Sequence, residues 1–170
     1  MSSLLYVVLF LLVVDVLSFS LLPLSAPRRS LSPAATSKGI PEASVEWDQF
    51  DGTELLLPQG VQPLGVVHFT GGQVVGSVPR SAYGPFLEGI CSGGYIVVAP
   101  PAPFSQFDHT SVACDSVRDF RRAYRELETL YGRATLRRMP VFGVGHSLGA
   151  KLQVLLNSYP DVREVAMRRK

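Results

Sequence analysis

Late in the sequence, one serine stands between two glycines that are each two residues away. Gly145, Ser147 and Gly149 form this pattern, and an apolar run that begins at Val141 precedes it. A serine at a sharp turn between a strand and a helix can expose its hydroxyl as a nucleophile, and flanking glycines let the strand and the helix approach closely. The pattern therefore predicts that Ser147 attacks a carbonyl carbon, and that the backbone N–H of Leu148 stabilises the resulting oxyanion.

A second group of small residues follows an earlier apolar segment, residues 64–69. Thr70, Gly71 and Gly72 form this group. In a site of this type the second oxyanion donor is a backbone N–H from a loop after a neighbouring strand. We therefore expect one of these three residues to supply it. Loss of one such donor typically lowers turnover about 100-fold or more.

A serine hydroxyl needs a base to react at neutral pH, and the chain has three histidines. His68 ends the apolar segment and is the best placed of them, although a packing role is favoured for it. His146 adjoins Ser147, so its ring should diverge from the serine and pack or cap. Asp108 and His109 precede an expected helix, whose N-terminus the aspartate should cap.

No histidine follows Ser147. The sequence therefore predicts a nucleophile without the acid and base that usually come after it, and hence a domain that is incomplete at its C-terminal end. Residues 161–167 are expected to begin a further strand.

The composition indicates one globular domain. The chain has 170 residues, 46% of them apolar, and a net charge of +2, which gives no reason to expect nucleic-acid binding. Cys91 and Cys114 lack metal-ligand spacing, and we expect them to be buried thiols. The chain also shows no paired carboxylates and no phosphate-binding loop, so we expect no cofactor and no metal.

The first 41 residues resemble a targeting sequence. Residues 4–14 are an apolar run of the length of a signal-peptide core, and Asp15 ends it too early for a bilayer span. We expect residues 1–18 to be a signal peptide and residues 19–41 a transit-like segment, together a two-part plastid address. Secretion, or anchoring to a membrane through the apolar run, is the alternative.

The remainder, residues 42–170, alternates between strand and helix patterns, with a turn at Asp51-Gly52. Strands are expected at residues 45–50, 54–57, 64–69, 95–99 and 140–144, and helices after Pro79, at residues 117–131 and at residues 148–156. Strands separated by helices predict an α/β fold with a mostly parallel sheet and flanking helices. A sheet ending at residues 140–144 would leave that strand as an open edge, so we expect this chain alone to fold poorly.

Several segments together resemble a plastid and cyanobacterial α/β-hydrolase-like family, which is known by the placeholder name domain of unknown function 1350. The matching segments are residues 68–72, Gly76, Pro79, Tyr83, residues 94–99, residues 107–109 and residues 141–152. The resemblance implies an α/β-hydrolase fold over residues 45–157 and a plastid setting. It carries the nucleophile position onto Ser147, and the oxyanion positions onto Leu148 and residues 70–72. It implies no substrate.

Three functions follow from these observations. The first is a serine hydrolase acting on an ester, thioester or lipid substrate. The second is a non-catalytic α/β-hydrolase-like plastid protein that binds a ligand or a partner, and the third is an inactive fragment. The expected partner is a small molecule or a lipid-like substrate, and membrane contact is expected only through the N-terminal apolar run.

Overall fold

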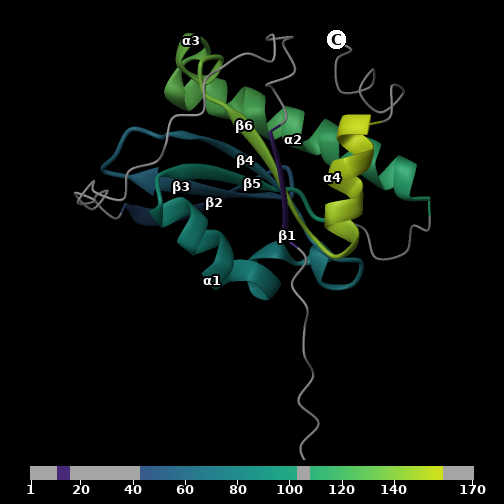
Figure 1. The fold of residues 1–170 in the computed structure, drawn as a ribbon. Coiled ribbons are helices and arrows are strands. Elements are labelled where there is room, and N and C mark those ends of the chain that lie inside the picture. The colour runs from purple at the N-terminus through teal and green to yellow at the C-terminus, as the bar shows by residue number, and fades with distance from the viewer. Residues whose placement is uncertain (1–10, 16–42, 103–107, 159–170) are drawn as a thin grey trace, which may run out of the picture.

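The structure is a computed structural model that describes residues 11–15, 43–102 and 108–158. These residues form one sheet with helices on both faces (Figure 1). Most of the expected signal and transit segments lies outside the described residues, as does the further strand expected at residues 161–167.

The sheet has six strands in the order β1-β6-β4-β5-β3-β2. The strands are β1 Leu11–Asp15, β2 Ser44–Phe50, β3 Thr53–Gln59, β4 Gly65–Thr70, β5 Tyr95–Ala99 and β6 Val141–His146. The five strands expected after residue 42 are thus confirmed, with their ends shifted by at most two residues. Only the centre is parallel, where β4 pairs with β5 and with β6. The remaining pairs are antiparallel, so the sheet is mixed and the expectation of a mostly parallel sheet holds only for its centre.

The antiparallel half begins with a hairpin whose turn was predicted from the sequence. Asp51 and Gly52 join β2 to β3 with positive φ angles of 47° and 78°. Tight hairpins favour turns with positive φ at both central positions, and a short polar residue followed by glycine adopts them most easily. The hairpin extends the sheet by two strands without any helical crossover.

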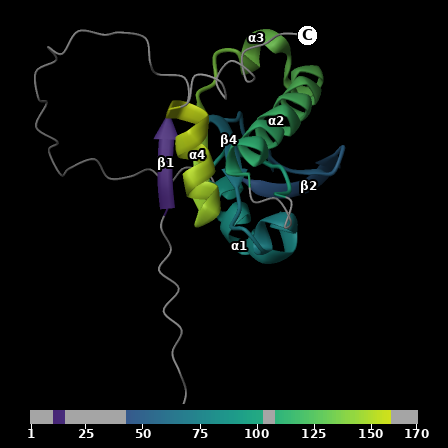
Figure 2. The same cartoon turned by 90° about the vertical axis from the view of Figure 1, so that its right-hand side faces the viewer.

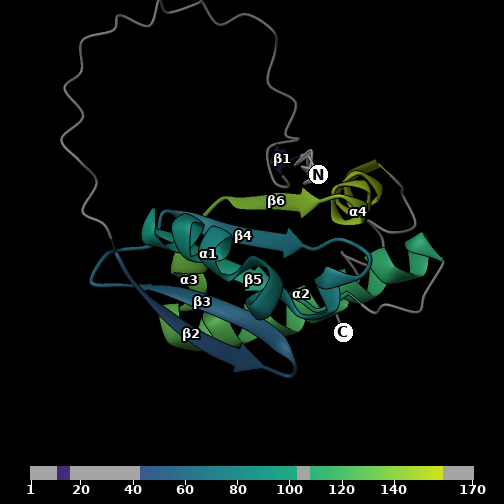
Figure 3. The ribbon, with the colours of Figure 1, turned by 90° about the horizontal axis from the view of Figure 1, so that it is seen from below.

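Three main helices cover the sheet: α1 Pro79–Ser92, α2 His109–Tyr131 and α4 Leu148–Ser158. Two short helices accompany them, η1 Val75–Ser77 before α1 and α3 Arg133–Leu136 after α2. Because side chains alternate along a strand, β4 divides its contacts between the two faces. Val67 and Phe69 pack with Leu87 of α1, whereas Val66 packs with Leu127 of α2. Figures 1 and 3 show α1 and α2 on opposite sides of the sheet.

The edge of β6 is covered, contrary to our expectation of an open edge. β1 pairs with β6 in antiparallel register, with Leu11 opposite His146 and Asp15 opposite Phe142. Figure 2 shows β1 running beside α4. The backbone of β1 pairs with the N–H and C=O groups that β6 would otherwise leave open at the edge, and its two valines favour an extended strand. Cleavage of residues 1–18 as a signal peptide would remove β1, so this pairing belongs to the uncleaved chain. The signal peptide itself stays a prediction.

Both cysteines are thiols, with Cys91 buried and Cys114 half-buried. Burial raises the pKa of Cys91 to about 12, so this side chain behaves as a small apolar residue of the α1 face. Within the described residues, no helix is long and apolar enough to cross a membrane.

Candidate active site

Ser147 lies at the bend between β6 and α4, as the sequence predicted. β6 ends at His146 and α4 begins at Leu148, and Ser147 is exposed between them. Its φ angle is 55°, and Asp51 is the only other non-glycine residue of the described chain with a positive φ. This conformation costs a residue with a side chain roughly 1–2 kcal/mol. The bend therefore holds the hydroxyl outside the packed interior at an energetic cost.

The two flanking glycines are required because α4 lies very close to both β6 and β4. A Cβ atom added to Gly145 would lie 2.4 Å from the carbonyl carbon of Gly149. A Cβ atom added to Gly149 would lie 1.9 Å from the carbonyl oxygen of Thr70. Both distances are far below van der Waals contact, so α4 packs backbone to backbone against the end of β4.

Buried hydrogen bonds fasten this contact. The Thr70 hydroxyl donates to the carbonyl oxygen of Gly149 at 2.9 Å. The Gln153 amide of α4 donates to the carbonyl oxygen of His68 at 3.1 Å and to the Thr70 hydroxyl oxygen at 3.2 Å. The side chain of Thr70 therefore braces α4 against β4.

The glycine loop after β4 turns back on itself beside Ser147. The N–H of Gly76 donates to the carbonyl oxygen of Gly72 at 2.7 Å. A Cβ atom on Gly71 would lie 2.5 Å from the Cα of Gly76, so these two glycines interlock. A Cβ atom on Gly72 would lie 3.5 Å from the Cβ of Ser147. The loop predicted to carry the second oxyanion donor is thus next to the serine.

Tyr83 of α1 is part of this arrangement, although the sequence analysis did not place it in the site. Its hydroxyl oxygen accepts a hydrogen bond from the N–H of Gly72 at 2.8 Å and lies 2.9 Å from Nδ1 of His146. Burial raises the pKa of the Tyr83 phenol, and the Gly72 hydrogen bond lowers it to a smaller extent. The N–H of Gly72 is already bonded, which leaves Gly71 as the better second donor among residues 70–72. In the sequence, only the family resemblance pointed to Tyr83.

His68 packs against α2, which agrees with the packing role favoured for it, and its described contacts do not involve Ser147. Its Nε2 lies 3.0 Å from the hydroxyl oxygen of Ser116 on α2, and its ring stacks on Phe120 with centroids 4.5 Å apart. Burial without a charged partner lowers the pKa of His68 to about 3. The ring is therefore neutral and packs in the core.

The predicted cap at the start of α2 is confirmed. The carboxylate of Asp108 accepts hydrogen bonds from the N–H groups of Thr110 at 3.0 Å and Ser111 at 3.3 Å. His109 begins the helix, and its Nδ1 accepts from the Lys151 ammonium of α4 at 2.8 Å. Within residues 43–102 and 108–158, no histidine or carboxylate forms a hydrogen bond to the Ser147 side chain, and no cluster suited to a metal ion is present.

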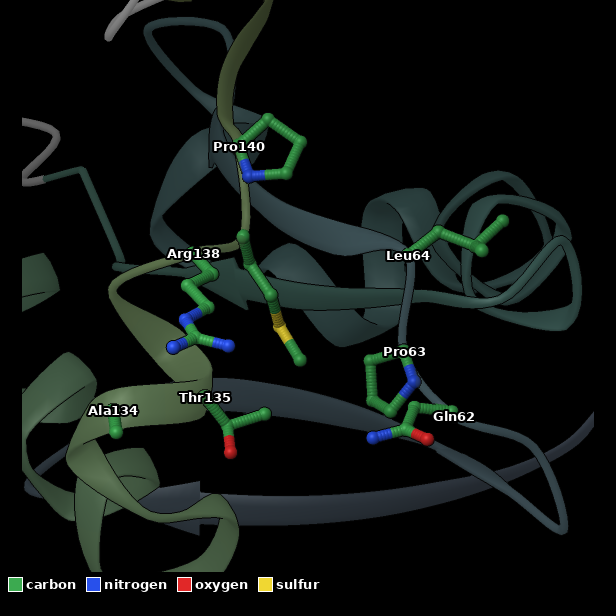
Figure 4. A pocket seen from close by; sticks show the side chains of 8 residues that line it. Gln62, Pro63, Leu64, Ala134, Thr135, Arg138 and Pro140 are labelled. Carbon is green, nitrogen blue, oxygen red and sulfur yellow. The ribbon is translucent and has the colours of Figure 1, made fainter.

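A hollow lies at the opposite edge of the sheet, where β4 and β6 begin. It is lined by Gln62, Pro63, Leu64, Ala134, Thr135, Arg138, Met139 and Pro140 (Figure 4). Arg138 is its one charged lining residue. Sites in parallel sheets lie at the carboxyl ends of the strands, and Ser147 occupies that end. The hollow is therefore a weaker candidate for an active site than the surroundings of Ser147.

The fold and the site together define a mixed α/β protein with an exposed serine at a strand-to-helix turn and a glycine loop beside it. The chain belongs to the family described as "Protein of unknown function (DUF1350)", whose family model matches residues 46–167. The predicted resemblance to this family is thereby confirmed, and the family description names no activity. No curated protein and no solved structure matches the chain.

Proposed function

We propose that this protein is a serine hydrolase of the α/β-hydrolase type, acting on carboxylic esters or thioesters. The observation that carries the proposal is the exposed Ser147 with its φ of 55°, held between two glycines at the end of a central parallel strand. A structural serine gains nothing from a strained backbone, whereas a nucleophile gains access to substrate.

The position of Ser147 in the sheet supports the same proposal. From β4 the chain crosses to β5 on one side, and from β5 it crosses to β6 on the other side of β4. Ligands of open α/β sheets bind where the strand order reverses in this way, outside the carboxyl ends of the strands. The ends of β4 and β6 meet at that point, with Thr70 opposite Gly145.

The reaction follows from the groups that meet there. The Ser147 Oγ attacks the substrate carbonyl carbon, the alcohol or thiol leaves, and water then hydrolyses the acyl-enzyme. The N–H of Leu148 opens a helix and has no intrahelical partner, so it can donate to the oxyanion. We assign the second donor to Gly71. The proposal names the nucleophile and the oxyanion donors, and assigns no base among the described residues.

An apolar acyl group suits the surroundings of the serine. Val74, Val75 and Val78 follow the glycine loop and are 61%, 41% and 52% exposed. The buried, interlocked Gly76 holds this short segment next to Gly71, so that the exposed valines flank the loop beside Ser147. Apolar surface left in water is stabilised when an apolar chain covers it. We therefore propose acyl esters or thioesters with an aliphatic chain as the substrate class.

A fluorophosphonate probe tests the proposed function, because it reacts covalently with activated serines. The full chain should be labelled, the Ser147→Ala variant should not, and Ser158→Ala at the exposed end of α4 should be labelled like the parent. Absence of labelling in a folded parent protein would reject catalysis. It would favour a non-catalytic α/β-hydrolase-like protein that binds a ligand at the same edge.

We also propose a plastid location, on the strength of the apolar run and the acid-free, Arg- and Ser-containing segment after it. Imaging of a C-terminally tagged protein tests this, with a variant lacking residues 1–41 as control. Secretion of the tagged full chain would contradict it.

A further inference from the structure

We propose that Tyr83 is a positioning residue, which locks the glycine loop to the serine turn through its hydrogen bonds to Gly72 and His146. The inference rests on the function proposed above, since it concerns how the oxyanion donors of that reaction are held. Because the N–H of Gly72 donates to Tyr83, Gly72 has a structural role, and the N–H of Gly71 is the second hydrogen-bond donor to the oxyanion.

The hydroxyl of Tyr83 joins three separate parts of the fold. The ring comes from α1, which covers one face of the sheet, and packs edge-on against Phe69 with centroids 4.9 Å apart. Its oxygen is 2.8 Å from the N–H nitrogen of Gly72 and 2.9 Å from Nδ1 of His146. One side chain thus connects α1, the loop after β4 and the end of β6.

The Gly72 contact fixes one role in this group. Gly72 can only donate through its N–H, so the Tyr83 oxygen accepts from it. In the proposed arrangement the phenol donates its own hydrogen to Nδ1 of His146, which places the imidazole hydrogen on Nε2. This hydrogen bond then fixes the orientation of the ring.

This chain of bonds ends at the residue before the strained serine. His146 is half-buried and is the last residue of β6, so holding its ring also restrains the backbone that leads into Ser147. At the other end, holding Gly72 fixes the loop that interlocks with Gly76. The hydrogen bonds of the Tyr83 hydroxyl go to Gly72 and His146 and not to Ser147, so Tyr83 acts through the two groups that it holds.

The decisive variant is Tyr83→Phe in the full chain, which removes the hydroxyl and keeps the ring against Phe69. Tyr124→Phe is the matched control. It removes a half-buried hydroxyl that donates to the carbonyl oxygen of Leu136 at 2.9 Å, on the α2 side of the sheet. Three quantities are measured: the rate of fluorophosphonate labelling, the amide hydrogen exchange of Gly72, and the His146 tautomer from imidazole ¹⁵N shifts at neutral pH.

We expect Tyr83→Phe to lower the labelling rate roughly 10-fold or more, since small misplacements of reacting groups are costly. Gly72 exchange should become roughly 10-fold faster, because its hydrogen bond is lost. The Nε2–H tautomer of His146 should give way to a mixture. Tyr124→Phe should change none of the three.

A second variant keeps the test decisive if Tyr83→Phe does not fold. His146→Phe deletes the same hydrogen bond from the other partner, and should slow labelling while Gly72 remains protected. Parent-like labelling of a folded Tyr83→Phe, or an unchanged His146 tautomer, would overturn the inference. Failure of the parent protein to label at all would instead reject the proposed function, and the two NMR readouts would still decide whether Tyr83 couples Gly72 to His146.

Discussion

Ser147 combines exposure with a backbone conformation that serine adopts only at a cost. A side chain in the left-handed region crowds the following carbonyl, and glycine avoids this because it has no Cβ. The stability of the chain at this position is therefore below what glycine would give. The proposed reaction requires the serine side chain, whereas folding would favour a residue without a Cβ.

This conflict gives a direct test of the bend. Ser147→Gly should raise the free energy of unfolding by about 1 kcal/mol relative to Ser147→Ala, because only glycine relieves the positive φ. Both variants should lose probe labelling. Urea denaturation of the two proteins measures the difference, and equal stabilities would show that the bend is unstrained.

His68 makes stability depend on pH. Burial lowers the pKa of His68 from 6.5 to about 3, so between these values the unfolded chain binds a proton that the folded chain does not. Stability is therefore fully present above about pH 6.5 and is lost as the pH falls. The contribution has a limiting slope of about 1.4 kcal/mol per pH unit.

Denaturation at several pH values between 7 and 4 measures this slope. His68→Gln cannot take up a proton, so its unfolding free energy should depend less on pH than that of the parent by about that amount. Other titrating groups are common to both proteins and cancel in the difference. Parallel curves for the two proteins would mean that the folded state protonates His68 easily.

At the residue scale, the sequence predicted features that depend on neighbouring residues and missed contacts between residues far apart in the chain. Ser147, its two glycines and the Asp108 cap each depend on neighbours within a few positions, so their spacing predicted them. Tyr83 meets His146 across 63 positions of the chain, and no periodicity reports such a contact. The sequence likewise did not reveal the partner of His68, Ser116 on α2, which is 48 positions away, although it favoured a packing role for His68.

At the scale of elements, the junction of α4 with β4 leaves no room for a methyl group. Gly149→Ala should lower the unfolding free energy by roughly 3 kcal/mol, since its Cβ would lie 1.9 Å from a backbone oxygen that cannot move without disturbing β4. Gly89→Ala in α1 is the control. A Cβ atom there meets nothing within 4 Å, and alanine in a helix should add about 1 kcal/mol.

Thermal unfolding followed by circular dichroism distinguishes the two glycine variants, which should shift the melting temperature in opposite directions. A Gly149→Ala protein as stable as the parent would mean that α4 can move away from β4. The backbone contact that places Ser147 would then be looser than the distances indicate.

The η1 segment carries a prediction about substrate size. Replacing Val74 and Val78 by serine should raise the KM for a long-chain ester roughly 10-fold, because the apolar surface that we propose for the acyl chain is lost. The KM for an acetyl ester should not change. Val154→Ser is the control, since this valine is 44% exposed on α4. Equal effects on both esters would place the acyl chain elsewhere.

Elements were easier to predict than their pairing. The Asp51-Gly52 turn and the β-branched segments between helices specify strands locally, and five of the six were expected. Strand direction depends on crossovers, so a hairpin at the edge produced the antiparallel half that the alternating pattern did not indicate. The sixth strand, β1, came from a segment whose apolar run also fits a signal peptide.

On the scale of the whole molecule, β1 determines whether the sheet of the uncleaved chain ends in a paired or an open edge. Uncovered edge strands pair with other chains. Val13→Pro removes a backbone N–H from β1 at the position opposite Val144 and should weaken this pairing. We expect the variant to form dimers or larger species, measured by size-exclusion chromatography with light scattering.

Val13→Thr is the matched control, because it keeps the backbone N–H and the branched Cβ. The Val13→Thr variant should keep the oligomeric state of the parent. If both variants elute like the parent, β1 contributes nothing to the protection of β6. Thermal unfolding of the parent tests the expectation that the chain folds poorly by itself, since a sharp, reversible melting transition of the monomer would contradict it.

The direct contact of Gly149 with the Thr70 carbonyl has one further implication. With no side chain between them to yield, α4 cannot slide along β4 or tilt away from it when a substrate enters. The proposed nucleophile, Ser147, therefore stays fixed to the sheet. Under the proposed function, adjustment to acyl groups of different length has to come from the exposed valines after the glycine loop, where a substitution changes substrate choice without weakening the serine turn.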